Sequence, residues 1–268
     1  MSISKRVEDA RKAFEKGDLE SSAKAHDLGR IRAEHREKHG GVGHQYIGEM
    51  VYGGLDGIIT TFAVVSGVAG ADLGAHVILI LGLANLFADG FSMATGAFLS
   101  SRSEQEYYNR ELERERWEVE HFPEAERAEL KEIYLARGYS EENAERLVEA
   151  HTSSPERWVQ AMMIDELGLL PDERKPLISA LATFVSFVAA GSMPLLIYLI
   201  GLITPIPPGI AFPISLALSA AALFGLGAAK VFVTGLKPLR SGLEMLIVGG
   251  LAAAVAYAVG ALLKNVGG

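Results

Sequence analysis

The sequence contains no cysteine. This absence excludes disulfide bonds and thiolate metal sites, so any metal ligand must be an oxygen, nitrogen or thioether group. The first 45 residues also lack the apolar stretch of a signal peptide, and we expect no cleavable one. Basic residues are in deficit, with 25 Lys and Arg against 33 Asp and Glu and a formal net charge of −8. This charge repels phosphate backbones, so we expect no nucleic-acid partner.

Apolar residues are abundant and are gathered into long blocks. They make up 49% of the 268 residues, and the mean hydropathy is +0.22. A run of about 20 apolar residues crosses a bilayer as one helix, and most charged residues lie outside such runs. The sequence therefore predicts an all-α, polytopic protein of the lipid bilayer with five transmembrane helices. The predicted spans are Ile47–Gly70, Val77–Leu99, Leu177–Ile200, Phe212–Val233 and Leu243–Leu263.

The polar blocks define the remaining organisation. The predicted parts are a polar N-terminal segment (1–43), spans 1 and 2 (44–100), a cytosolic helical insert (101–175) and spans 3 to 5 (176–268). Lys237 and Arg240 lie in one short loop, whereas the loops near Asp72 and Pro205 contain neither Lys nor Arg. The positive-inside rule then places the N-terminus and the insert in the cytosol, and we expect a multi-pass protein of the inner (cytoplasmic) cell membrane.

The second span continues into the insert without a break. Residues 100–120 contain neither proline nor glycine but are rich in Glu and Arg, so one long helix should run from apolar into charged sequence. Pro123 should end this helix. Gly138 should end a second helix of the insert, Ser140 should cap a third, and Pro155 should begin a fourth that stops near residue 168.

Carboxylates recur on single faces of the insert helices, because spacings of three and four residues bring side chains together on an α-helix. The residues related in this way are Glu111, Glu115 and Glu118, then Glu126 and Glu129, then Met162, Met163 and Glu166. Carboxylates with a thioether suit a divalent first-row ion, here Fe²⁺ or Mn²⁺, with Zn²⁺ and Co²⁺ as further candidates. The alternative is a solvated surface, since Arg110, Arg114 and Arg116 interleave with these glutamates and could pair with them.

Two histidine motifs give weaker indications of a metal site. His35 and His39 lie one helical turn apart in the N-terminal segment, a spacing that is more often chance on a solvated helix. Glu118 and His121 form one Glu-x-x-His element of the ferritin-like di-iron bundles, but those bundles need two such elements and the insert has one. The alternative to a transporter is a membrane-anchored iron-binding or ferroxidase protein.

Ionisable residues inside apolar spans are functional candidates, because placing each one in a bilayer costs at least about 2.5 kcal/mol. Asp56 lies in the first span, and Asp89 and Met93 lie four residues apart on one face of the second. The alternatives are an aspartate that only pairs with a neighbouring helix and a methionine that only packs. Gly53 and Gly57 form a GxxxG pattern, which allows another helix to approach closely.

The segments GGLDGIITTFAVVSGVAGA and GLANLFADGFSMATGAFLSSRSEQEYY, with MMIDELGL in the insert, resemble the vacuolar iron transporter family. The resemblance covers about Glu49 to the C-terminus and leaves out residues 1–43. It implies five spans, a homodimer with the ion path near the two-fold axis, and export of divalent metal from the cytosol in exchange for protons. Gly53 and Gly57 would then pack at the dimer axis.

The resemblance also implies roles for individual residues. Asp56 and Met93 match residues of the membrane path. The insert positions that match the family's metal-binding residues are Glu115, Glu118, Glu126, Glu129, Met162, Met163 and Glu166. At Asn85 the family leads us to expect a glutamate, and Asp89, one turn further on, is the candidate to replace it. We expect a proton-coupled exporter of Fe²⁺, with Mn²⁺ as a further substrate, and not an enzyme.

Overall fold

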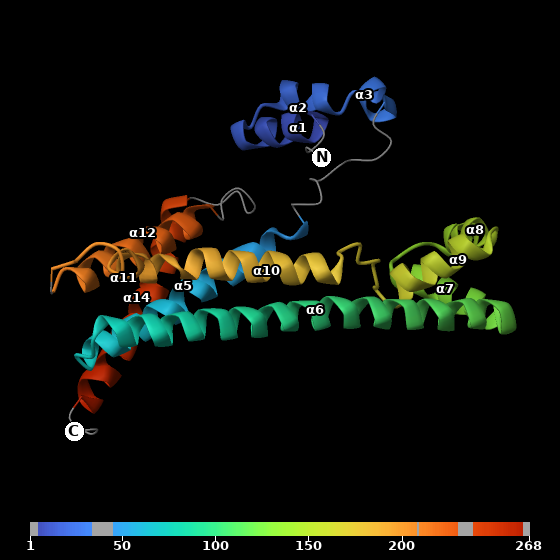
Figure 1. Ribbon diagram of the computed structural model, residues 1–268. Helices are drawn as coiled ribbons and strands as arrows, with labels where there is room; N and C mark the ends of the chain where they lie inside the picture. Colours follow the sequence, from blue (N-terminus) through green and yellow to red (C-terminus); the bar gives the residue numbers. More distant parts are fainter. Residues whose placement is uncertain (1–4, 34–44, 208, 230–237, 265–268) are drawn as a thin grey trace. The chain divides into compact units, whose positions relative to one another are not determined.

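The computed structural model describes residues 5–33, 45–207, 209–229 and 238–264. Within these ranges the regular structure is entirely helical. Five helical stretches are long and apolar enough to cross a membrane (Figure 1). They are α5 (Ile47–Gly70), α6 (Ala75–His121), the Pro176–Ile200 stretch that contains α10 and α11, α12 (Ala211–Ala229) and α14 (Pro238–Leu263). The predicted all-α fold with five spans is confirmed.

The chain divides into two compact units. Residues 1–97 and 177–268 form the unit that contains the spans, and residues 98–176 form the second unit, which contains the predicted insert. Helix α6 contributes residues to both, because its 47 residues continue unbroken from apolar into charged sequence. The predicted long helix is confirmed, and Pro123 begins the next helix as its fixed φ favours.

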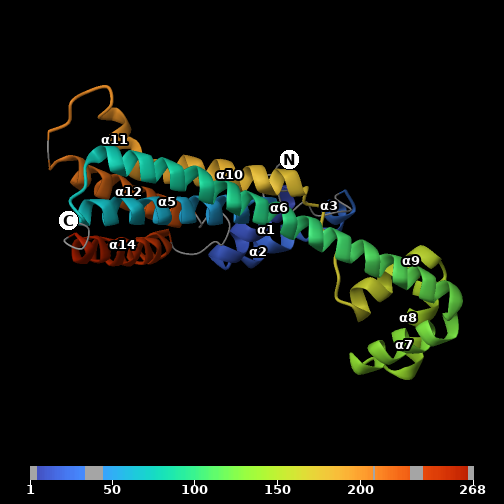
Figure 2. The ribbon, with the colours of Figure 1, turned by 60° about the horizontal axis from the view of Figure 1, so that its bottom comes forward.

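The helices of the membrane unit lie side by side (Figure 2). They approach closely at glycines, which carry no side chain. A Cβ at Gly260 of α14 would lie 2.0 Å from the carbonyl oxygen of Gly67 in α5, far inside van der Waals contact. A Cβ at Gly57 of α5 would lie 2.3 Å from the carbonyl oxygen of Phe187 in α10 (Pro176–Gly191). Small residues at such contacts allow the backbone-to-backbone packing on which transmembrane helices depend.

The GxxxG pair packs against α10 of the same chain. Besides the contact at Gly57, a Cβ at Gly53 would lie 2.7 Å from the carbonyl oxygen of Thr183. The prediction that this motif admits another helix is confirmed, but its assignment to a dimer axis is wrong, because α10 already occupies this face. The motif specifies close approach and carries no information on which helix approaches.

Gly57→Ala is expected to lower the unfolding temperature of the detergent-purified protein by roughly 5 °C, since overpacking costs about 1–3 kcal/mol and here the obstacle is backbone. The matched control is Gly96→Ala in α6, where a Cβ would meet nothing within 4 Å. Thermal unfolding followed by circular dichroism measures both. Equal shifts in the two variants would contradict the close contact between α5 and α10.

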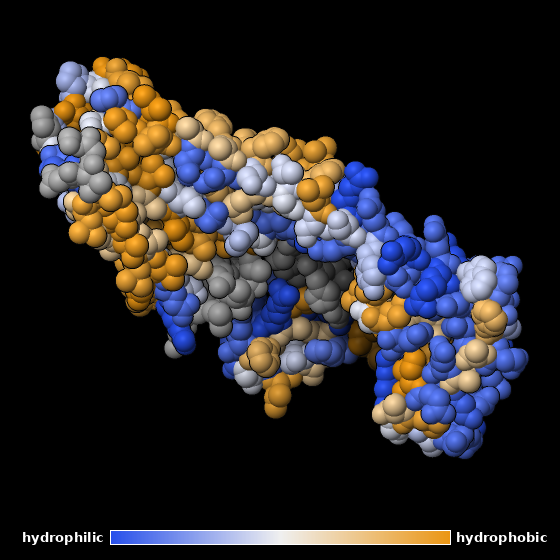
Figure 3. Space-filling model, turned by 90° about the horizontal axis from the view of Figure 1, so that it is seen from below, coloured by the Kyte–Doolittle hydropathy of each residue, from blue (hydrophilic) through white to orange (hydrophobic). Residues whose placement is uncertain are grey.

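Shorter elements complete the membrane unit. Helix α10 gives way to a 3₁₀ turn at Met193–Leu195, which leads into α11 (Leu196–Ile200), and Ser215 of α12 donates a hydrogen bond of 2.5 Å to the Pro194 carbonyl. The N-terminal segment contains α1 (Lys5–Lys16), α2 (Leu19–Ala25) and α3 (Leu28–Ala33). His35 and His39 lie outside the described residues. Figure 3 shows apolar side chains gathered over the spans and hydrophilic ones over the insert.

The insert adds three α-helices and one π-helix to the charged half of α6. These are α7 (Pro123–Ala136), α8 (Glu141–Thr152), α9 (Pro155–Ala161) and the π-helix Met162–Glu166. The predicted breaks are confirmed: Gly138 has a φ of +91°, the Ser140 side chain accepts a hydrogen bond from the Asn143 N–H, and Pro155 begins α9. The fourth predicted helix differs, because its last turn is a π-helix.

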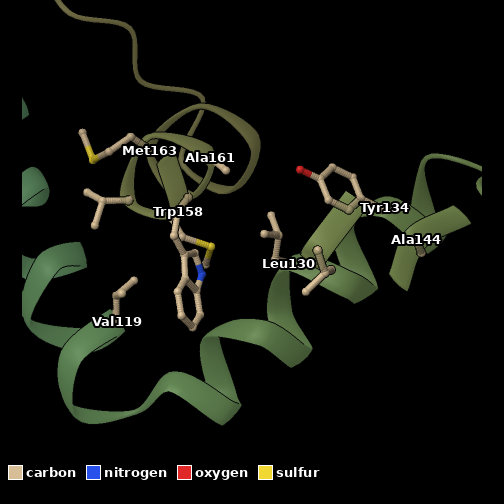
Figure 4. Close-up of a cluster of buried hydrophobic side chains, with 10 residues drawn as sticks. Val119, Leu130, Tyr134, Ala144, Trp158, Ala161 and Met163 are labelled. Carbon is tan, nitrogen blue, oxygen red and sulfur yellow. The ribbon is translucent and has the colours of Figure 1, made fainter. Parts of the chain in front are cut away.

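One hydrophobic core holds these helices together (Figure 4). Its buried members are Val119, Leu130, Tyr134, Ala144, Val148, Trp158, Val159, Ala161, Met162 and Met163. They come from α6, α7, α8, α9 and the π-helix, so each element of the insert contributes to the same core. This shared core fixes the positions of the charged residues on the same helices.

Candidate metal-binding site

Two glutamates of the insert are buried where glutamate is normally exposed. Glu115 on α6 has no exposed surface, and Glu126 in the first turn of α7 is 5% exposed. Both carboxylate oxygens of Glu115 and one of Glu126 accept no hydrogen bond from the described residues. Buried carboxylates without hydrogen-bond donors are costly. Arg114 forms an ion pair with Glu115, but the oxygens that lack hydrogen bonds still favour a further bound proton or cation.

A third carboxylate completes a cluster. Glu166, exposed at the end of the π-helix, places one oxygen so that the chosen oxygens of Glu115, Glu126 and Glu166 all lie within 4.8 Å of one another. Two oxygens bound to one ion at about 2.1 Å are at most about 4.2 Å apart. The three side chains therefore need only a small inward movement to share a divalent cation.

The environment raises the pKa of all three carboxyls. Burial, followed by the charge of Glu166, raises the pKa of Glu115 to about 7. Burial, with the nearby charges of Glu129 and Glu118, raises the pKa of Glu126 to about 7. Burial and the charge of Glu129 also raise the pKa of Glu166. When ionised, the three carboxylates repel one another at short distance, and nearby positive charge does not fully offset this repulsion. A bound cation would offset it.

Glu118 and Glu129 lie outside the group of three. Glu118 is partly buried and accepts a hydrogen bond of 2.5 Å from Arg114. Glu129 on α7 is exposed, and it acts on the cluster through its charge. The predicted pairing of Arg114 with these glutamates thus holds for Glu118, and it extends to Glu111 and Glu115. Glu115 nevertheless converges with Glu126 and Glu166.

Met162 and Met163 belong to the hydrophobic core. They are 0% and 1% exposed and pack with residues such as Leu130 and Trp158. Sequence spacing placed them with Glu166 on the face of an α-helix, but these residues form a π-helix, which widens the turn and changes the angle between successive side chains. The structure therefore shows both methionines packed in the core of the insert.

Side chains that sequence analysis missed fasten the π-helix to α7. The Tyr134 hydroxyl donates a hydrogen bond of 3.1 Å to the Asp165 carboxylate, which also forms an ion pair with Arg137. Arg137 donates a second bond, of 3.0 Å, to the Asp165 carbonyl. Because α7 also carries Glu126, these bonds fix Glu126 relative to Glu166. The only signal in the sequence was the acid beside Glu166 in MMIDE.

The Glu-x-x-His element does not form part of the cluster. The Nδ1 atom of His121 lies 2.8 Å from the Trp117 carbonyl oxygen, and its ring stacks on Trp117 with 4.5 Å between centroids. Its partner Glu118 is engaged by Arg114. Among the described residues, the group of potential ligands contains carboxylates and no histidine.

The candidate residues of the membrane unit lie on two helices. Asp56 on α5 is partly buried, and Asn85, Asp89 and Met93 are partly buried at four-residue spacing on α6. The Asp89 carboxylate is close enough to act electrostatically on Asp56, and the buried Asn85 Nδ2 has no hydrogen-bond partner among the described residues. Met93 packs against the core of the spans. The structure thus brings the two aspartates into electrostatic range of each other.

A protein-family model identifies the family to which this chain belongs. The model of the VIT family matches residues 47–261. The chain belongs to the VIT family. Within the VIT family, it is 38% identical to the vacuolar iron transporter of Toxoplasma gondii over 97% of this chain and 89% of that protein. It is 34% identical to vacuolar iron transporter 1 of Arabidopsis thaliana over 86% of this chain and 91% of that protein.

Similarity to VIT proteins also extends into the N-terminal segment. The vacuolar iron transporter of Plasmodium falciparum is 32% identical over 98% of both chains. Coverage of 97% and 98% in the Toxoplasma and Plasmodium comparisons leaves too little of the chain out to exclude residues 1–43. The prediction that this segment lies outside the resemblance is therefore wrong, although the VIT family model itself begins at residue 47.

Proposed function

We propose that this chain is a proton-coupled transporter that moves Fe²⁺, and also Mn²⁺, out of the cytosol across the inner membrane. The observation that carries the proposal is the convergence of Glu115, Glu126 and Glu166 in a unit attached to five membrane-spanning helices. Relatives at 31–38% identity, all named vacuolar iron transporters, support iron as the substrate.

In this proposal, residues 101–175 form a cytosolic domain that captures the metal through these three carboxylates. Glu118 and Glu129 are charges at its margin, and Met162 and Met163 are thioethers within reach of a rearranged site. Hard oxygen ligands favour Fe²⁺ and Mn²⁺, and Zn²⁺ or Co²⁺ would also bind. The ion path through the spans uses Asp56, Asp89 and Met93 beside Asn85, within a homodimer.

Proton coupling follows from the energetics of export. Moving two positive charges out of a cell against about 100 mV costs about 4.6 kcal/mol. Inward proton movement offsets this cost, and a carboxylate such as Asp56 can hold a proton in one half-cycle and the metal in the other. No redox chemistry by the protein is needed for this cycle.

Purified protein in sealed liposomes tests the proposal. A pH gradient should drive uptake of Fe²⁺ or Mn²⁺, measured by a trapped metal-sensitive dye, with proton movement in the opposite direction and none in protein-free liposomes. Metal binding without uptake would instead support the membrane-anchored iron-binding protein. Oxygen consumption with Fe²⁺ and without uptake would support a ferroxidase.

Apparent metal affinity should depend steeply on pH. The pKa values of Glu115 and Glu126 are raised to about 7, so at pH 6 both carboxyls hold protons that the metal must displace. If both protons leave on binding, Mn²⁺ should bind about 100-fold more tightly at pH 8 than at pH 6. Titration calorimetry in two buffers of different ionisation enthalpy also counts the released protons. A flat profile would contradict binding by these two carboxylates.

A further inference from the structure

Arg114 is in contact with the carboxylates on its face of α6. Its Nε lies 2.9 Å from Glu111, its Nη2 lies 2.7 Å from Glu115 and its Nη1 lies 2.5 Å from Glu118. The contact with Glu115 is an ion pair without hydrogen-bond alignment, because both oxygens of that buried carboxylate accept no hydrogen bond. One guanidinium thus contacts three glutamates, one of them a member of the converging group.

The charge of Arg114 reaches the whole cluster. Its guanidinium lowers the pKa of Glu111, and at Glu115, Glu126 and Glu166 it opposes the upward pKa shift caused by burial. Arginine stays charged at every physiological pH, so it is a permanent positive charge at the edge of the site. The Arg114 side chain is nevertheless 41% exposed, which leaves it room to move into solvent.

We propose that Arg114 is a built-in counter-cation of the metal site, which a divalent ion must displace from Glu115. This inference rests on the proposed function, since it assumes that the insert captures a metal. Displacement of Arg114 also releases Glu118, which then becomes free to serve as a further ligand. A resident positive charge keeps the metal affinity moderate, as a transporter needs in order to hand its cargo on.

The same contact provides selectivity by charge. A monovalent ion that replaces the guanidinium at Glu115 exchanges one positive charge for another and gains little. A divalent ion brings one additional charge to the cluster and interacts with Glu115, Glu126 and Glu166 together. Arg114 therefore discriminates against Na⁺ and K⁺, which are abundant in cells, without any contact to the transported ion.

The test compares Mn²⁺ affinity of Arg114→Gln with that of the wild-type full chain in detergent at pH 8. Arg114→Gln should bind Mn²⁺ about five- to tenfold more tightly, the size expected from loss of one partly exposed ion pair that competes with binding. Arg102→Gln is the matched control, because Arg102 forms an exposed pair with Glu106 on the same helix. It removes the same charge and should leave the affinity unchanged.

A second readout separates this role from a structural one. Replacing N-methylglucamine chloride by NaCl at equal ionic strength should weaken Mn²⁺ binding by Arg114→Gln several-fold, and binding by the wild type hardly at all. Arg114→Lys, which keeps the charge but loses the planar fork, should stay within about threefold of the wild type in both tests.

The outcomes distinguish this inference from the proposed function. Equal or weaker Mn²⁺ binding by Arg114→Gln, with wild-type binding intact, would overturn the role of Arg114 alone. A wild type that binds neither Mn²⁺ nor Co²⁺ would overturn the metal site and this inference with it. An unfolded Arg114→Gln protein accompanied by an Arg114→Lys protein that binds tenfold more tightly than wild type would also overturn it, since the charge would then not be the competitor.

Discussion

Glu115→Gln combined with Glu126→Gln is expected to weaken Mn²⁺ and Co²⁺ binding by more than about 100-fold, since changes beyond the direct ligands alone cost 10- to 100-fold. The substitutions keep side-chain volume and remove two of the three converging carboxylates. Equilibrium dialysis at pH 8 measures the loss. Because the amide is uncharged, the same change tests whether charge, and not shape, holds the metal.

In the absence of metal, the same double substitution should stabilise the protein at high pH. The pKa of both glutamates is raised to about 7, so the folded insert holds their protons more tightly than the unfolded chain does. These two glutamates therefore make the folded protein less stable as the pH rises from about 4.5 to about 7. The double variant should therefore unfold at a higher temperature than the wild type at pH 8 without metal, while the difference disappears near pH 4.5.

Glu113→Gln is the matched control for this prediction. Glu113 lies on the same helix but is exposed, so its change should affect binding less than about twofold. An equal loss of binding in Glu113→Gln and in the double variant would show general surface electrostatics and not a site. Glu104 is a poorer control, because it forms an ion pair with Arg174 that ties α6 to the end of the insert.

Sequence reasoning reached the helices because their signals are local. Apolar runs defined the spans, the absence of breakers between residues 100 and 120 predicted the length of α6, and Pro123, Ser140 and Pro155 marked the start of new helices. Each of these signals acts within one helical turn of its own residue. The continuity of α6 followed from composition alone, because no tertiary contact is needed to extend a helix that nothing interrupts.

Which residues meet could not be predicted from such signals. Glu115, Glu126 and Glu166 come from three elements that only the hydrophobic core of the insert brings together. The same core takes in Met162 and Met163, and their burial could not be predicted from spacing alone. Periodicity is also the same for a surface face and a site face, so it could not separate the partly buried Glu118 from the fully buried Glu115, both of which pair with Arg114.

Asp56→Asn is expected to reduce transport to background while leaving Mn²⁺ binding by the insert intact. The change removes a charge that can hold either a proton or a metal ion, but it hardly alters volume, so packing of α5 should survive. Asp56 and the insert lie in separate compact units of the structure, and substitutions that share no contact partners usually have independent effects. Liposome uptake and equilibrium dialysis on the same preparation measure the two quantities.

Asp72→Asn is the control, since it removes an acid at the exposed turn after α5, where Asp72 pairs with Lys264. Its φ of +58° is one that asparagine tolerates, so transport should persist.

Asp89→Asn then tests the replacement of the carboxylate missing at Asn85. Asp89 acts electrostatically on Asp56, and if the two share the ion, loss of either should be equally severe. Full transport by Asp56→Asn would remove the membrane site, whatever the insert binds, and would leave α6 carrying the path alone.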